Sequence, residues 1–183
     1  MLTRRQVLIG SAITDSAATS NETSFDLDTA SRWKVIGHEN DPSLVLNVNG
    51  RIVAGAIDGL APIACTPNGD VPGFAASVRP DRLLIALDAA DFNTAQFARS
   101  LWDLRAAGWF DDAAGIVIGR TAGEIVSGYT VRDAADDVLG DLNVPVVYDA
   151  DIGHLPPQMA WVQGATATLR VSDGVGQLTQ TLA

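Results

Sequence analysis

The sequence predicts an α/β domain built on a mixed sheet, with a parallel strand–helix–strand centre and antiparallel hairpins at its ends. Leu83–Asp88 and Gly115–Gly119 are nearly continuous apolar runs separated by a stretch with helical spacing of apolar residues. A third run, at 144–148, follows a second helix-like stretch. Asn49-Gly50 and Ser172-Asp173-Gly174 are typical of tight hairpin turns. Together these patterns favour a sheet that is parallel in the middle.

The first 80 residues carry the weakest patterns. Apolar runs flank Asn49-Gly50 on both sides, which favours a hairpin. The many Gly and Pro residues over 55–80 predict irregular structure. The other expected elements are a strand at Gln6–Ile9, a loop over 14–31, a strand at Trp33–Ile36, and the two hairpin strands Leu44–Val48 and Arg51–Ala54.

The first predicted crossover has clear helix ends. Asn93 followed by Gln96 forms a capping pattern, and Gly108 suits the end of the helix. Because a strand that crosses over through a helix returns parallel, the strands within 83–119 are expected to be parallel.

The second predicted helix is capped at Thr130 and ends near Gly140, just before the strand at 144–148. The chain then closes with a hairpin formed by Ala165–Val171 and Gln177–Leu182. We see no linker that splits this region into smaller domains. The domain division that we predict is therefore 1–30, a strand and loop left from a preceding domain, and 31–183.

The charge of the chain limits its partners. The 183 residues include 12 Lys and Arg against 22 Asp and Glu, for a net charge of −10, and no basic run occurs. We therefore expect no nucleic-acid partner and no membrane partner. No apolar stretch approaches the ~18 residues that a membrane-spanning helix needs.

Cysteine and histidine are scarce. Cys65 is alone and two histidines occupy unrelated positions, so we expect no disulfide, no metal and no cofactor. The Cys65 side chain is expected to be a small buried apolar group. Arg4-Arg5 before a short apolar stretch allows a twin-arginine export signal, but that stretch stops at Thr14, and a first strand is the alternative.

Three polar residues follow the three strands of the parallel centre. Asp88 ends the first strand, Arg120 follows the second, and His154 comes after the third. The carboxyl ends of parallel strands share one edge, where open α/β sheets bind ligands. A carboxylate beside an imidazole is the orienting half of a catalytic triad. The alternatives are that Asp88 caps the next turn and that His154 has no catalytic role.

Three segments then resemble a known family, the C-terminal domain of the serine LD-carboxypeptidases, which includes muramoyltetrapeptide carboxypeptidases and microcin C immunity proteins. The central segment runs from the strand at 84–88 through Leu104-Arg105-Ala106-Ala107-Gly108 to Gly115–Arg120. The second joins Val144-Pro145-Val146, Gly153-His154 and Gly164-Ala165-Thr166-Ala167. Upstream, 50–58 is similar to the family's Gly-x-Leu-x-Gly-Gly-Asn-Leu segment.

The resemblance implies a swivelling β/β/α-like fold with catalytic His154 and with Asp88 in place of the family's glutamate. It implies serine-dependent hydrolysis of an L,D-amide bond in murein tetrapeptides, in a cytoplasmic, cell-wall recycling context, with no metal. It also implies a homodimer. The alternative location is export through Arg4-Arg5.

The chain departs from the family pattern in three ways. Trp161-Val162 stands where the family tends to have Leu-Pro. Asp88 is shorter than glutamate by one methylene group, and the Gly-aromatic-Ser-Asp turn that carries the family's nucleophile does not occur. Ser11 has only a weak likeness to that turn. We therefore expect an N-terminal nucleophile domain as partner, and an exposed apolar face where it packs, with Trp33, Trp109 and Trp161 as candidates and ordinary core packing as the alternative for each.

The leading hypothesis is therefore the acid- and histidine-bearing domain of a serine carboxypeptidase that acts on murein-derived peptides. A catalytically inactive peptide-binding module of the same fold is the second hypothesis. A third, based only on Arg4-Arg5, is an exported domain with an unrelated role.

Overall fold

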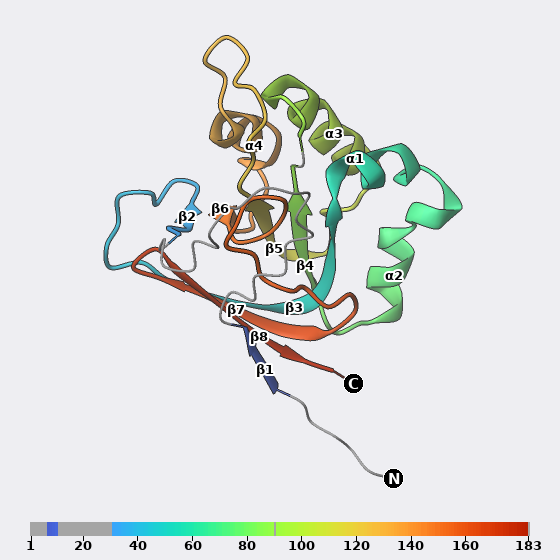
Figure 1. Cartoon of the computed structure of the whole chain (residues 1–183). Helices are drawn as coiled ribbons and strands as arrows, with labels where there is room; N and C mark the ends of the chain where they lie inside the picture. The colour runs from blue at the N-terminus through green and yellow to red at the C-terminus, as the bar shows by residue number, and fades with distance from the viewer. Residues whose placement is uncertain (1–6, 11–30, 90, 183) are drawn as a thin grey trace, which may run out of the picture.

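The computed structural model of the chain describes residues 7–10, 31–89 and 91–182 (Figure 1). The strands are β1 (Val7–Gly10), β2 (Lys34–Val35), β3 (Val45–Ala56), β4 (Leu83–Asp88), β5 (Ala113–Gly119), β6 (Val146–Ala150), β7 (Thr166–Ser172) and β8 (Val175–Thr181). The helices are α1 (Ile57–Leu60), α2 (Val71–Ser77), α3 (Thr94–Ala106) and α4 (Val131–Leu139), with short 3-10 turns η1 (Ala61–Ile63) and η2 (Pro67–Gly69).

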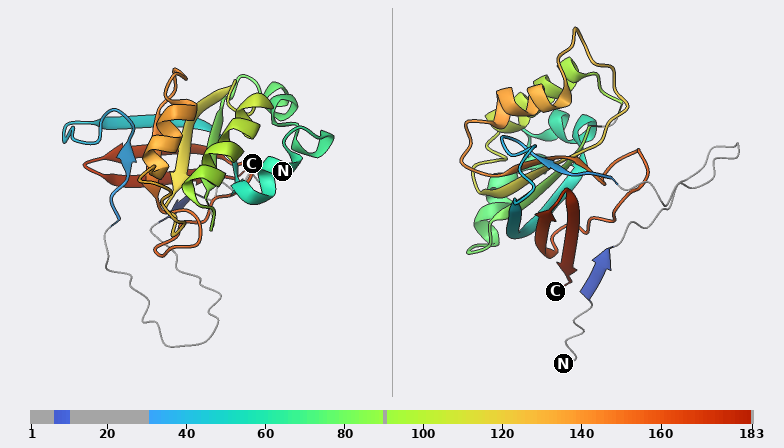
Figure 2. Two further views of the ribbon diagram at one scale, coloured as in Figure 1. Left: turned by 90° about the horizontal axis from the view of Figure 1, so that it is seen from above. Right: turned by 90° about the vertical axis from the view of Figure 1, so that its left-hand side faces the viewer.

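The described strands form one mixed sheet in the order β1-β8-β7-β3-β4-β5-β6-β2. Neighbouring strands from β3 to β6 are parallel, and the pairs at both ends of the sheet are antiparallel. Figures 1 and 2 show α1, α3 and α4 over one face of the parallel centre. The predicted fold class is confirmed, and both predicted capping boxes, at Asn93 and Thr130, are present.

The two faces of the sheet bury separate apolar clusters. All six residues of β4 are buried, and successive side chains of a strand point to opposite faces. Leu83, Ile85 and Leu87 pack beneath the helices. Leu84 and Ala86 belong to the second cluster, on the other face. By the same alternation Asp88 lies on the face away from the helices.

The sheet curls around this second cluster. At one end of the sheet, the Trp33 backbone N–H donates a hydrogen bond to the Gly174 carbonyl in the β7–β8 turn, at 2.8 Å. The Trp33 side chain is only 2% exposed, and a Cβ on Gly176 would lie 2.3 Å from its indole ring. Glycine at 176 therefore lets the tryptophan close the curl.

The tryptophans do not form the expected exposed face. Trp33 and Trp109 are buried in the two clusters, so their assignment to a missing interface is wrong. Trp161 is partly buried and packs against the second cluster. Apolar side chains have the same sequence signature in a core as at an interface, and the curl supplied core positions for them.

The predicted hairpin at Asn49-Gly50 is wrong, because β3 continues through it as one strand. The first half of β3 pairs antiparallel with β7, and the second half pairs parallel with β4. A Cβ on Gly50 would lie 2.8 Å from the Leu84 nitrogen. Gly50 therefore permits a close approach to β4, rather than a turn.

The segment 55–80 is also more regular than predicted. It forms α1, η1, η2 and α2, with Asp70 capping α2 through the Gly73 N–H. Cys65 lies between η1 and η2, where its side chain is exposed, so the predicted burial is wrong. Pro62, Pro67 and Pro72 lie in the first turns of η1, η2 and α2.

The other end of the sheet is β1, which pairs antiparallel with β8. β1 begins and ends one residue later than the strand predicted at 6–9. Arg4-Arg5, Ser11 and most of the loop predicted over 14–31 lie outside the described residues. The closing hairpin is confirmed, with positive φ at Asp173 and Gly174 as its two-residue turn requires. No helix in the described part of the chain is both long and apolar enough to cross a bilayer.

The close approach at Gly50 gives a stability prediction. Gly50→Ala should lower the free energy of unfolding by about 1–3 kcal/mol, because backbone atoms of β4 must shift to admit the methyl group. Urea unfolding followed by circular dichroism measures the loss. The matched control is Gly59→Ala, in exposed helical backbone with nothing within 4 Å, which should be neutral or slightly stabilising. Equal stability of the two variants would contradict this account.

Candidate functional site

The carboxyl ends of β4, β5 and β6 meet at one edge of the sheet because these strands are parallel. Asp88, the last residue of β4, is held at this edge with its side chain only 8% exposed. Its paired residue in the neighbouring strand β3 is Ala56. A buried carboxylate needs partners to remain stable, so its surroundings determine its role.

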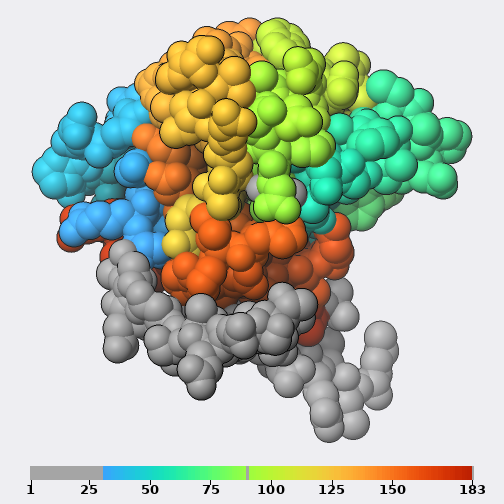
Figure 3. Space-filling model, turned by 45° about the horizontal axis from the view of Figure 1, so that its top comes forward, coloured from blue at the N-terminus to red at the C-terminus, as the bar shows by residue number. Residues whose placement is uncertain are grey.

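His154 supplies such a partner. It lies in the loop after β6, and its Nδ1 is 2.7 Å from Asp88 Oδ2. Figure 3 shows this loop, in orange, at the surface beside the green chain that follows β4. The imidazole is 66% exposed, so the pair has a buried acid and an accessible ring. With the Nδ1 proton donated to the carboxylate, the neutral ring keeps Nε2 as a free proton acceptor.

Gly153 makes the contact possible. Its φ is +106°, and a Cβ there would lie 2.2 Å from Asp88 Oδ1. Only glycine therefore lets the loop pass this close to the carboxylate while taking the required backbone conformation. Gly153 directly precedes His154 in the sequence, but its steric role depends on the approach of Asp88 and was not predicted.

A β-bulge sets the direction of the loop. Val117 pairs with Val147, but Gly119 pairs with Ala150, so β6 has one extra residue. Asp149 lies in the bulge with φ +58°. Its Oδ2 accepts a hydrogen bond from Lys34 Nζ at 2.8 Å, which raises the pKa of that ammonium group. The bulge turns Ala150 and Ile152 toward the second apolar cluster.

Arg120 was predicted at the same edge as Asp88 and His154. The structure pairs Asp88 with His154, whereas Arg120 forms an ion pair with Asp151 at 2.9 Å. Asp151 Oδ2 accepts a hydrogen bond from Ser31 Oγ at 2.6 Å. Sequence analysis missed Asp151; a charged residue between apolar Ala150 and Ile152 was the available signal.

The nucleophile is the component that the described residues do not show. No serine among them donates a hydrogen bond to His154, and Ser11 lies outside them. Likewise, no group of three or more His, Cys, Asp or Glu within the described ranges could hold a metal ion. The observed arrangement can orient an imidazole and use it to accept or donate a proton.

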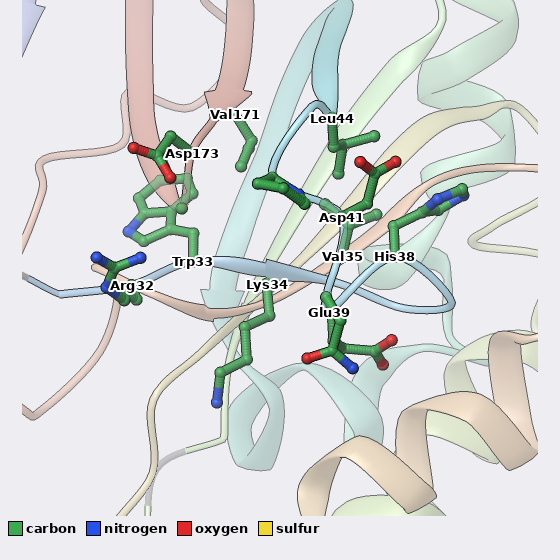
Figure 4. Close-up of a pocket in the computed structure, with 13 residues that line it drawn as sticks. Arg32, Trp33, Lys34, Val35, His38, Glu39, Asp41, Leu44, Val171 and Asp173 are labelled. Carbon is green, nitrogen blue, oxygen red and sulfur yellow. The ribbon is translucent and has the colours of Figure 1, made fainter.

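A separate pocket of about 350 Å³ lies between β2, the loop after it and the β7–β8 turn (Figure 4). Its walls contain both cationic and anionic side chains, and neither Asp88 nor His154 lines it. Lys34 is paired with Asp149, and Glu39 is paired with Arg132. The balanced charges favour no class of ligand, so the Asp88–His154 pair is the stronger candidate site.

The pair predicts a defined tautomer. In neutral His154 the ring proton should reside on Nδ1, because Asp88 accepts it. Long-range ¹H–¹⁵N correlation spectra distinguish the two tautomers. Asp88→Ala should remove the preference at His154 and leave His38, which has no side-chain hydrogen bond to a described residue, as an internal reference. An unchanged His154 spectrum in this variant would exclude the contact in solution.

The steric role of Gly153 also gives a prediction. Gly153→Ala should lower the free energy of unfolding by more than about 1 kcal/mol and separate His154 from Asp88. Gly164→Ala is the matched control, since Gly164 also has positive φ but nothing within 4 Å of its Cβ position. Both variants carry the backbone strain, and only the first adds the clash. Identical unfolding curves and identical His154 spectra for the two variants would contradict the steric role of Gly153.

Comparison with solved structures shows the same fold in larger proteins. A muramoyltetrapeptide carboxypeptidase from Oxalobacter formigenes is 19% identical, with a TM-score of 0.61 over 82% of this chain and 49% of that chain. An MccF-like protein from Bacillus anthracis str. Ames is 20% identical, with a TM-score of 0.59 over 82% and 43%. The microcin C7 self immunity protein MccF is 16% identical, with a TM-score of 0.63 over 97% and 50%.

The chain thus spans about half the length of these solved proteins. No curated protein matches it. Residues 49–169, however, match the family model described as the LD-carboxypeptidase C-terminal domain. This range contains most of the parallel centre and both residues of the Asp88–His154 pair. The chain therefore belongs to the LD-carboxypeptidase C-terminal domain family.

Proposed function

We propose that this domain supplies the acid and the histidine of a Ser–Asp–His triad that hydrolyses L,D-amide bonds of murein tetrapeptides. The observation that carries the proposal is the 2.7 Å contact between Asp88 Oδ2 and His154 Nδ1, at the carboxyl edge of a domain of this family. A cytoplasmic role in cell-wall recycling belongs to the same proposal.

The proposed chemistry follows from the two ring nitrogens. His154 Nε2 takes the proton of a serine hydroxyl as the oxygen attacks the amide carbonyl, and later gives that proton to the leaving amine. Asp88 holds the Nδ1–H tautomer and stabilises the imidazolium that forms between these steps. Its burial suits this role, because few water molecules can compete with the imidazole for the carboxylate.

The nucleophile is proposed to come from an N-terminal domain. This chain spans only about half of the solved relatives, and their remaining half leaves room for such a domain. Two MccF structures hold glutamyl sulfamoyl guanosine and adenosine monophosphate, which are small ligands. We propose a murein-derived peptide as the small ligand of this protein. The predicted homodimer and the division at residue 30 stay predictions.

The alternative function is a peptide-binding module without catalysis. Two substitutions at the edge favour it. Asp88 is one methylene group shorter than the family's glutamate, although it still reaches the imidazole. Ala56, the neighbour of Asp88 in β3, stands where the family segment has asparagine, so the amide group is missing there. One change alters the acid itself, and the other alters the residue beside it in the sheet.

Reconstitution tests the proposal. The chain alone should not turn over an L,D-tetrapeptide, whereas the chain combined with the matching serine-bearing N-terminal domain should release the terminal D-amino acid, measured by liquid chromatography and mass spectrometry. His154→Ala should lower kcat by about 10³-fold or more, because the proton-transfer group is lost. The control is His38→Ala, which should retain full activity.

The outcomes separate the two functions. Equal turnover by His154→Ala and by the unchanged protein would overturn the triad. Binding of the tetrapeptide by calorimetry, without turnover in the reconstituted protein, would support the binding module instead. A loss confined to the His154 variant supports the enzyme.

A further inference from the structure

One guanidinium group, that of Arg120, contacts the loop on both sides of His154. Arg120 Nη2 donates to Asp151 Oδ1 at 2.9 Å and to the Pro157 carbonyl at 2.6 Å, with a longer contact of 3.3 Å to the Leu155 carbonyl. Its Nη1 donates to the Pro156 carbonyl at 3.1 Å. These acceptors lie on both sides of His154 in the chain. One side chain therefore fixes the path of the loop through the position of the imidazole.

The anchor is itself firmly placed. Arg120 directly follows β5, and its backbone N–H bonds to the Ala150 carbonyl at 3.2 Å. Asp151 is held by Ser31 Oγ, and its carbonyl accepts from the Met159 N–H at 2.8 Å. The guanidinium is 21% exposed and the Asp151 carboxylate 10% exposed. A charge-assisted pair at this depth is poorly screened, so it is stronger than an exposed pair.

The part of the loop next to His154 depends on Arg120, whereas the far end of the loop, from Gln163 to Ala165, is hydrogen-bonded to β3. Residues 151–165 form no helix or strand, so their carbonyls need partners outside regular structure. Three successive carbonyls, from 155 to 157, turn toward Arg120. Farther along, the buried Gln180 side chain binds the Ala160 carbonyl and the Val162 N–H. Among these anchors, Arg120 is the one whose acceptors lie on both sides of His154.

The same contacts argue against another role for Arg120. An arginine at the ligand edge of a sheet often binds a substrate carboxylate through its planar fork. Here both terminal nitrogens already donate to groups of the loop, and Nε is buried. Binding a carboxylate would require release of these bonds. The guanidinium is therefore committed to the protein.

We propose that Arg120, through its ion pair with Asp151, is a positioning residue that keeps His154 Nδ1 against Asp88. The expected effect of Arg120 on catalysis rests on the proposed function. Its expected effect on the position of His154 rests on the loop geometry alone. Lysine has the charge but not the fork, so it cannot serve these separate acceptors. Displacement of the imidazole by about 1 Å can lower a rate by about 100-fold.

The first test uses the chain alone. Arg120→Met should remove the Nδ1–H preference of His154 in long-range ¹H–¹⁵N spectra, and Arg120→Lys should restore it only in part. Arg105→Met is the matched control, because Arg105 also pairs with an aspartate, Asp141, and donates to a carbonyl, that of Val138, but joins α3 to the end of α4. It should leave the His154 spectrum unchanged. An unchanged His154 in folded Arg120→Met overturns the proposal.

The second test uses the reconstituted enzyme. Arg120→Met should lower kcat by about 10- to 100-fold with KM changed less than about threefold, whereas a substrate-binding arginine would mainly raise KM. If circular dichroism shows that Arg120→Met does not fold, kcat is measured for Arg120→Lys and Asp151→Asn instead. Both variants should lower kcat, by less than Arg120→Met would. Unchanged kcat in these variants overturns the positioning role.

The two proposals fail in different ways. If His154→Ala keeps full activity, the proposed function is wrong, while the spectra of the Arg120 variants still decide the role of the loop anchor. If His154→Ala is inactive but folded Arg120 variants keep both kcat and the His154 tautomer, only the positioning role is wrong.

Discussion

The 2.7 Å contact between the buried Asp88 carboxylate and the exposed His154 imidazole is the feature around which this edge of the sheet is organised. A carboxylate at the end of a central strand is costly to bury unless a group donates to it. The imidazole meets this need and is oriented in return, with one nitrogen bound and the other open. The same contact therefore stabilises the strand end and prepares a proton acceptor.

Several features of the fold serve this contact. The parallel strands bring three loops to one edge, and the bulge at Asp149 redirects the chain after β6. Gly153 then removes the Cβ that would strike Asp88. The short side chain of Asp88 reaches the imidazole because the loop comes so close. The contact therefore depends both on the position of the loop and on the length of the acidic side chain.

Two large aromatic residues, Trp33 and Trp109, are buried in the core of the domain. Trp33 closes the curl of the sheet and Trp109 packs under the helices, so the surface that would meet a nucleophile domain is not marked by these side chains. The edge that carries Asp88 and His154 is polar and held by hydrogen bonds. An exposed imidazole beside a fixed carboxylate suits a site that is completed by a second domain.

The sequence by itself determined the parallel centre, because buried strands are continuous apolar runs and the capping boxes at Asn93 and Thr130 are local. It also placed Asp88, Arg120 and His154 at one edge, since parallel strands share their carboxyl ends. Tertiary structure decided the rest. Asn49-Gly50 favours a turn locally, but the approach of β4 to Gly50 keeps it extended. Likewise, the 2.7 Å contact and the hold of Arg120 on the loop depend on distances between segments far apart in the chain, which local patterns do not encode.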